Sequence, residues 1–139
     1  MQSSKALGYL GIARRGNNIV IGEEPVGAAC RASHARLLIL ASDAADHTAR
    51  RAKSFAVSGK PPIMKTPFDK DTLGNTLGCN ACAMAAFTDV SLALEFAKAM
   101  DTPDEALIAL LQTQTERVKK RRTEEKAYRK NLRQGRKKA

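Results

Sequence analysis

The sequence predicts an α/β fold, a three-layer α/β/α sandwich built on four strands, with an additional basic helix at its C-terminal end. Short aliphatic runs alternate with segments whose apolar residues recur at helical spacing, which is typical of a sheet covered by helices on both faces. The run Leu37–Ala41 is apolar throughout, so it is expected to lie between two helical layers. The 139 residues, 43% of them hydrophobic, are sufficient for one core.

The elements follow from periodicity and from the residues that end them. Ile19 to Ile21 forms a β-branched run that Gly22 ends. The small residues between Ala81 and Phe87 suit a strand packed closely between helices. Helices are expected at residues 4–15, 23–32, 44–58, 70–77 and 91–100, and strands at residues 18–21, 37–41, 63–65 and 81–87.

Capping residues set the expected helix ends. Ser3 and Ser4 can cap the first helix, and Gly16 can supply its left-handed stop. Asp43 with Asp46 resembles a capping pair for the helix at 44–58. Asp69 can cap the helix at 70–77, and Gly78 can stop it. Pro25 is tolerated because it falls in a first turn, where the N–H groups have no intrahelical partner.

A separate C-terminal helix is expected after the body, so the chain divides into residues 1–101 and 102–139. Thr102, Pro103 and Glu105 form a helix start with Thr as the N-cap. The helix is expected to reach Gln134, frayed in its basic part and ordered mainly when it is bound. Its apolar stripe is predicted at Leu107, Leu110, Leu111 and Val118.

The charge is concentrated at the C-terminal end. The formal net charge is +10, from 24 Lys and Arg against 14 Asp and Glu. Residues 1–116 carry 12 of each kind, whereas residues 117–139, here called the basic tail, carry 12 basic residues and only Glu124 and Glu125. Basic blocks of this kind usually meet nucleic acid or another polyanion. The sequence therefore predicts a polyanionic partner.

Other classes of protein are disfavoured by composition. Three cysteines are too few for a secreted disulfide scaffold, and no apolar run approaches the length of a membrane span or a signal peptide, so a cytoplasmic protein without membrane attachment is expected. No phosphate-binding glycine loop or catalytic constellation is recognisable, so neither an enzyme nor a cofactor is expected. Cys79-Asn-Ala-Cys82 is a single Cys-x-x-Cys pair, which leaves a thiol protein as an alternative function. One such pair is not enough for a zinc site, so no metal site is expected. Cys30 and Cys82 are predicted to be buried.

The residues resemble a known family. The run Ala6 to Arg15 (ALGYLGIARR), the segment Ile21 to Glu24 (IGEE) and the run Ala35 to Ala44 (ARLLILASDA) are similar, in order and spacing, to the small bacterial branch of the L-seven-Ae/L-thirty-e ribosomal protein family. The resemblance covers about residues 4–100. It implies a mixed four-stranded sheet and binding of kinked (kink-turn) RNA without catalysis.

The resemblance also implies an RNA surface made of three segments, at residues 22–28, 42–47 and 88–92. Relatives of this type show Gly-x-Asn-Glu-x-x-Lys at the second helix, and here the Asn, Glu and Lys positions hold Glu24, Pro25 and Ala28. Glu23 and Glu24 can alternatively be ordinary first-turn acids that stabilise the helix dipole, and Arg14 and Arg15 ordinary last-turn bases. The candidate RNA-binding residues are Arg14, Arg15, Gly22, Glu23, Glu24, Ser42, Asp43, Thr88, Asp89, Val90 and Ser91.

The basic tail is expected to contact phosphates, which gives affinity without sequence specificity. The expected partner is structured RNA of the ribosome, as the family resemblance implies, with ribosomal proteins as further neighbours. The protein is expected to be a monomer. The alternative is a protein-interaction module that uses residues 103–118 as an amphipathic helix. The predicted phosphate-contacting residues are Arg117, Lys119, Lys120, Arg121, Arg122, Lys126, Arg129, Lys130 and Arg133.

Overall fold

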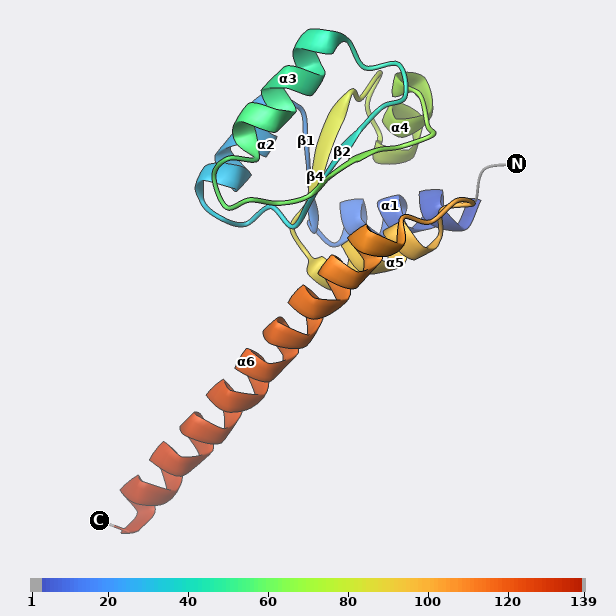
Figure 1. Ribbon diagram of the computed structural model, residues 1–139. Helices are drawn as coiled ribbons and strands as arrows, with labels where there is room; N and C mark the ends of the chain where they lie inside the picture. The colour runs from blue at the N-terminus through green and yellow to red at the C-terminus, as the bar shows by residue number, and fades with distance from the viewer. Residues whose placement is uncertain (1–3, 139) are drawn as a thin grey trace.

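The computed structural model describes the backbone of residues 4–138 and the side chains of residues 4–133. Its helices and strands alternate in the predicted order before a long C-terminal helix projects from the body (Figure 1). Ser3, one of the two predicted caps of the first helix, lies outside the described residues. The elements are α1 (Ser4–Arg15), β1 (Ile19–Ile21), α2 (Glu23–Arg31), β2 (Leu37–Leu40), α3 (Asp46–Phe55), β3 (Ile63–Lys65), α4 (Lys70–Leu77), β4 (Met84–Phe87), α5 (Val90–Lys98) and α6 (Glu105–Lys138).

The four strands form one mixed sheet in the order β1-β4-β2-β3. Strand β4 runs antiparallel to both of its neighbours, with Ile21 opposite Ala85 on one side and Leu40 opposite Met84 on the other. Strand β3 lies parallel to β2 as an outer strand of the sheet, with Leu40 opposite Lys65. The predicted four-stranded mixed sheet is therefore confirmed.

Strand β2 supplies the centre of the core on both faces of the sheet. Leu37 and Ile39 belong to a cluster with α1, α4, α5 and the start of α6, whereas Leu38 and Leu40 belong to a cluster with α2 and α3. All four strand residues are buried, as expected for a strand covered on both sides. The three-layer arrangement predicted from the sequence is confirmed.

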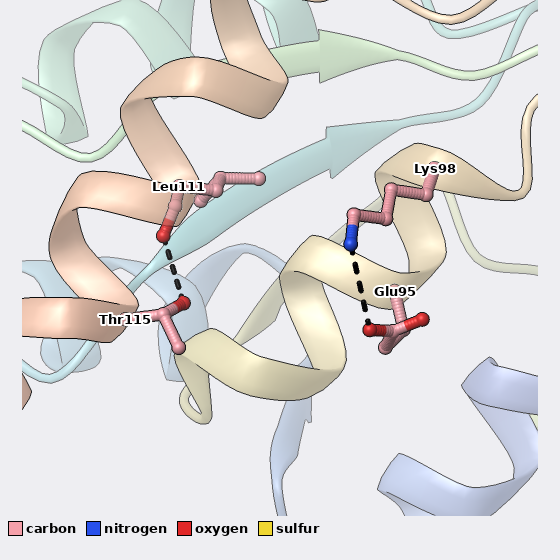
Figure 2. A network of polar contacts seen from close by, with 4 residues as sticks. All are labelled: Glu95, Lys98, Leu111 and Thr115. Carbon is pink, nitrogen blue, oxygen red and sulfur yellow. Dashed lines mark hydrogen bonds and ion pairs between the residues drawn. The ribbon is translucent and has the colours of Figure 1, made fainter. Parts of the chain in front are cut away.

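The first turns of α6 are part of the body. Leu107 and Leu111 are buried against the core, and the Thr115 hydroxyl donates a hydrogen bond of 2.8 Å to the Leu111 carbonyl on the side of the helix near α5 (Figure 2). The prediction for Leu110 is wrong: it is 44% exposed, and Ile108 is buried in its place. The face toward α5 thus runs through residues 108, 111, 115 and 118, at intervals of three and four.

Several predicted helix ends are corrected. Helix α6 begins at Glu105, because Asp104 rather than Thr102 is the cap: its Oδ1 accepts hydrogen bonds from the N–H groups of Ala106 and Leu107. It runs beyond the predicted Gln134 to Lys138 as a continuous helix. The left-handed residue after α1 is Asn17, with φ of 59°, and not Gly16.

The remaining ends are partly as predicted. Asp69 caps α4 by accepting from the Thr72 N–H at 2.8 Å, and Gly78 ends that helix in the left-handed conformation, so both predictions are confirmed. Helix α3 is shorter than the predicted 44–58 at both of its ends, and β4 is shorter than 81–87 because the residues before it form a loop. No helix among the described residues is both long and apolar enough to cross a membrane.

Candidate nucleic-acid interface

The sheet has two ends, and the predicted site residues are divided between them. At the first end, here called the Gly22 edge, β1 and β2 finish and β4 begins. The N–H of Gly22 donates to the carbonyl of Met84 at 2.9 Å, and the N–H of Ala41 donates to the carbonyl of Ala83 at 3.0 Å. These bonds place the start of α2, the loop after β2 and the loop before β4 side by side.

Gly22 stands at the N-cap position of α2, where its backbone has φ of 95°. An L side chain rarely adopts this conformation, so glycine is required for the sharp turn from β1 into the helix. No side chain caps α2. Pro25 has no N–H, and the Val26 N–H donates to the Gly22 carbonyl at 3.1 Å. The N–H groups of Glu23 and Glu24 are therefore the ones available for a ligand at the Gly22 edge.

The two acids at the start of α2 differ in their surroundings. Glu23 is half-buried and forms an ion pair of 3.0 Å with Arg51 of α3, whose guanidinium lies 5.5 Å from the centre of the Phe55 ring. Glu24 is exposed. The charge of Glu23 is thus partly compensated by a neighbouring cation, while that of Glu24 faces solvent.

Asp43 does not cap its own helix, and this prediction is corrected. Its Oδ1 accepts a hydrogen bond of 2.9 Å from the N–H of Lys70, the first residue of α4, while Ala45 occupies the N-cap position of α3. Asp43 therefore joins the loop after β2 to the start of α4. Ser42 is exposed beside it, and its N–H donates to the carbonyl of Phe68 at 2.8 Å.

The loop at residues 78–83 starts beside Arg14 and reaches the Gly22 edge only at its end, before β4; the sequence analysis missed it as part of the interface. It returns along α4, where the N–H of Cys82 donates to the carbonyl of Lys70 at 3.0 Å, and it leads directly into β4. The signal that would have found it is the antiparallel direction of β4, which puts the start of that strand beside the ends of β1 and β2.

The two cysteines of this loop differ in exposure. Cys82 is buried, as predicted, and its burial raises the pKa of the thiol to about 11, with the nearby Cys79 adding to the shift. Cys79 is half-buried. Cys30 is buried as predicted, and burial raises its pKa as well. No group of three His, Cys, Asp or Glu side chains in the described part of the chain could hold a metal ion.

The segment from Thr88 to Ser91 lies at the opposite end of the sheet, here called the Asn18 edge. The N–H of Thr88 donates to the carbonyl of Asn18 at 2.9 Å, and Asp89 caps α5 by accepting from the N–H of Leu92. The Val90 side chain is 4% exposed and part of the core. The expectation that this segment joins Gly22 and Ser42 in one surface is therefore wrong, because β4 carries it to the far end of the sheet.

Arg14 and Arg15 also lie at the Asn18 edge, at the end of α1. The Nε of Arg14 donates to the carbonyl of Leu77 at 3.1 Å, which satisfies the C-terminal end of α4. Both arginines line an open recess of about 460 Å³ together with Asn17 and Asn75. Arg14 thus has a structural role that the sequence analysis could not foresee.

The described part of the basic tail extends away from the body. Every side chain from Lys119 to Arg133 is exposed, whereas Val118 still packs partly against the core. Figure 1 shows α6 passing α5 and leaving the body beyond the N-terminal end of that helix. The tail therefore leaves from the Asn18 edge and points away from the Gly22 edge.

The fold and the site together define a small α/β/α sandwich whose polar loops and helix starts gather at one edge of a mixed sheet. No model of a protein family matches the sequence. The chain is 31% identical over 96 residues to RNA-binding protein YlxQ of Bacillus subtilis (strain 168), an alignment that covers 66% of this chain and 91% of that protein. The chain belongs to the L-seven-Ae/L-thirty-e family, which includes that protein.

Two solved structures are similar to this one. A protein of unknown function from Bacillus halodurans C is 28% identical, with a TM-score of 0.64, and is covered over 99% of its length by 71% of this chain. The Giardia lamblia 15.5kD RNA binding protein shares the fold at 16% identity, with a TM-score of 0.54 and coverage of 68% of this chain and 81% of that one. About a third of this chain lies outside each of these alignments.

Proposed function

We propose that the protein binds structured RNA and catalyses no reaction on it. The proposal is supported by its relative YlxQ, which is named as an RNA-binding protein, and by the Gly22 edge, where the uncapped start of α2 adjoins two polar loops. Structured RNA is recognised largely through its shape, its backbone and its unpaired bases, which suits loops fixed on a rigid sheet.

The Gly22 edge is the proposed reader of RNA shape. The free N–H groups of α2 and the positive end of its dipole favour phosphate oxygens or base carbonyls. The hydrogen bond from Lys70 to Asp43 fixes the loop after β2, so the edge presents a preorganised surface. We further propose a kink-turn type of RNA target, within ribosomal RNA and beside ribosomal proteins, bound by a monomer in the cytoplasm.

The basic tail is proposed to add affinity through phosphate contacts. Its exposed cations meet no acidic partner from the body among the described side chains, so they are free for a polyanion. Release of counterions then makes binding depend steeply on salt. The Gly22 edge would supply shape recognition and the tail would supply electrostatic attraction.

The proposal is tested with the full chain and three RNAs: a kink-turn stem, an unkinked duplex of the same length and total ribosomal RNA. Fluorescence anisotropy would measure Kd for the two labelled RNAs from about 50 to 300 mM KCl, and a filter-binding competition would include the ribosomal RNA. We expect tighter binding to the kink-turn stem that persists at the highest salt. Equal affinities for kinked and unkinked RNA would overturn the kink-turn proposal, and no binding to any RNA would overturn the function.

The two alternatives receive less support from the geometry. The apolar stripe proposed for partner binding is mostly covered, because Leu107 and Leu111 are buried in the body. The raised pKa of Cys82 keeps its thiol protonated near neutral pH, which disfavours thiolate chemistry at that residue.

A further inference from the structure

The body is electrostatically polarised along the sheet although its net charge is zero. The chain order and the strand directions show that α1, α2, α3, α4 and α6 all begin at the Gly22 edge and run toward the Asn18 edge, whereas α5 runs the other way. The end of α1 joins β1 through a 2.7 Å bond from the Asn18 N–H to the Ala13 carbonyl, and the end of α4 meets Arg14. The start of α6 lies at the other end, where Asp104 and Leu107 line one recess with Lys65.

This common direction sorts the charged residues. Acids favour helix N-termini and bases favour helix C-termini, because each helix carries about half a charge at each end. The Gly22 edge therefore collects nine carboxylates against four lysines, Lys5, Lys65, Lys70 and Lys98, and Arg51, which is paired with Glu23. The carboxylates are those of Glu23, Glu24, Asp43, Asp46, Asp69, Asp71, Asp101, Asp104 and Glu105.

The Asn18 edge has the opposite character. Five cations lie there, on the last turns of α1 and α2 and in the loops before β2 and β3, and the carboxylate of Asp89 is engaged as the cap of α5. A long polyanion is thus attracted to the end of the body from which the basic tail leaves. The five cations are Arg14, Arg15, Arg31, Arg36 and Lys60.

The basic tail is itself two-sided. The face that packs on the body through residues 108, 111, 115 and 118 continues at the same intervals as Arg122, Lys126, Arg129 and Arg133, here called the cationic stripe. At about 100° per residue, Glu124 lies nearly opposite the stripe, and Arg117, Lys120 and Arg121 lie more than about 100° from its centre. The side of α6 that faces α5 in the body therefore turns cationic where the body ends.

We propose that the cationic stripe and the Asn18 edge together form a second RNA interface, an inside corner that receives the phosphate backbone of a double-stranded stem. The inference rests on the proposed RNA-binding function and adds where, and by which face, the stem is held. From Arg122 to Arg133 the stripe spans about 17 Å of helix, enough to follow several successive phosphates.

A duplex is favoured over a single strand because Tyr128, the aromatic side chain of the tail, does not lie on the cationic stripe. Binding of single strands combines a basic groove with aromatic rings on which the bases stack. Tyr128 is 66% exposed but lies about 130° around the helix from the stripe. A membrane surface is disfavoured, because the exposed Leu132 shares its side of the helix with the acidic Glu125, about two turns earlier, so that side is not a broad apolar face.

The test compares two triple variants of the full chain that lose the same charge. One carries Arg122→Gln, Lys126→Gln and Arg129→Gln in the stripe, and the other carries Arg117→Gln, Lys120→Gln and Arg121→Gln outside it. Glutamine keeps a similar helix propensity, which circular dichroism would verify. The probes are an unkinked RNA duplex of about 20 base pairs, a single strand of the same length and vesicles of an anionic phospholipid.

We expect the stripe variant to bind the duplex at least about tenfold more weakly, with a salt slope lower by about 2 to 3, and the outside variant to change Kd less than about threefold. Equal losses in the two variants would overturn the stripe, and tighter binding of the wild type to the single strand or the vesicles than to the duplex would overturn the proposed partner. Failure of the wild type to bind the kink-turn stem as well would contradict the proposed function itself.

The body half of the corner is tested separately. The double variant Arg15→Gln and Arg36→Gln removes two cations from the Asn18 edge, and Lys65→Gln with Lys70→Gln removes two from the Gly22 edge. We expect the first pair to weaken duplex binding several-fold more than the second. Equal effects, or a larger effect of the second pair, would overturn the placement of the stem at the Asn18 edge.

Discussion

The Asp43 carboxylate accepts a hydrogen bond of 2.9 Å from the backbone N–H of Lys70, which lies 27 residues further along the chain. The contact joins the loop after β2 to the first turn of α4, where Asp69 supplies a second carboxylate to the Thr72 N–H. Two acids thus satisfy two of the free N–H groups at the start of one helix. The Gly22 edge owes part of its fixed shape to this arrangement.

Replacement of Asp43 by Ala removes the acceptor for the Lys70 N–H. Loss of a cap or of a hydrogen bond to a charged group costs about 1 to 2 kcal/mol, so the free energy of unfolding in urea should fall by that amount. Asp46→Ala is the control, because that exposed side chain lies in the first turn of α3 and accepts no backbone hydrogen bond of this kind among the described residues. Equal losses in the two variants would contradict a special role for Asp43.

Gly74 tests the close approach of α4 to the loop before β4. A Cβ at this position would lie 2.8 Å from the Cα of Ala81 and 2.9 Å from the carbonyl oxygen of Cys79, and both are backbone atoms that cannot turn aside. Gly74→Ala should therefore lower the free energy of unfolding by about 1 to 3 kcal/mol. Gly8→Ala, with no atom within 4 Å of the new Cβ, should leave stability unchanged or raise it by up to about 1 kcal/mol.

Two neighbouring leucines test whether the start of α6 is part of the body. Leu111 is fully buried, so Leu111→Ala should destabilise the protein by about 2 to 5 kcal/mol, as measured by urea or thermal unfolding. Leu110 is 44% exposed, and Leu110→Ala should cost less than about 1 kcal/mol. A small and equal effect of both changes would mean that α6 does not pack on the body.

The exposed Glu24 tests the electrostatics of the Gly22 edge. Glu24→Gln removes a negative charge beside the start of α2, so affinity for the kink-turn stem should rise a few-fold at low salt and the gain should shrink as salt screens it. Glu95→Gln removes the same charge on α5, where Glu95 is paired with Lys98 at 4.0 Å, and should change Kd less than Glu24→Gln does. An unchanged or higher Kd in the Glu24 variant would place the RNA away from this residue.

The cysteines should differ in reactivity and in their effect on alkaline stability. Cys79 is half-buried whereas Cys82 is 3% exposed, so iodoacetamide should label Cys79 first in the native protein, as followed by mass spectrometry. The pKa of Cys82 is raised from 9.0 to about 11, so its contribution to stability is complete below pH 9 and is lost as the pH rises toward 11. Cys82→Ala should remove this alkaline loss, and an unchanged pH profile in that variant would assign the loss to another group.

Much of the fold could be predicted because it rests on local signals. The apolar run at β2, the cap at Asp69 and the left-handed Gly78 each follow from residues close together in the sequence, and each was confirmed. The direction of β4 does not follow from such signals, because periodicity reveals which residues are buried but not which strands are neighbours. For that reason the loop at 78–83 was missed and the segment after β4 was placed at the wrong edge.

The errors in capping have a related physical cause. The segment from Thr102 to Glu105 offers two possible caps, and Asp104 is the one used because the helix must begin where Leu107, Ile108 and Leu111 can face the core. Tertiary packing also turned Leu110 outward. Arg14 found a partner 63 residues away, at Leu77, which no pattern within one helix could indicate.

Because α6 is one uninterrupted helix whose first turns are part of the core, it holds its two ends at a constant distance from each other. Glu105 and Arg133 are separated by about 42 Å along its axis. The protein would then select RNAs by the spacing between two contacts as well as by the bases at either one. Its selectivity would be a matter of length, set when the core forms and lost if the helix were hinged between Val118 and Arg122.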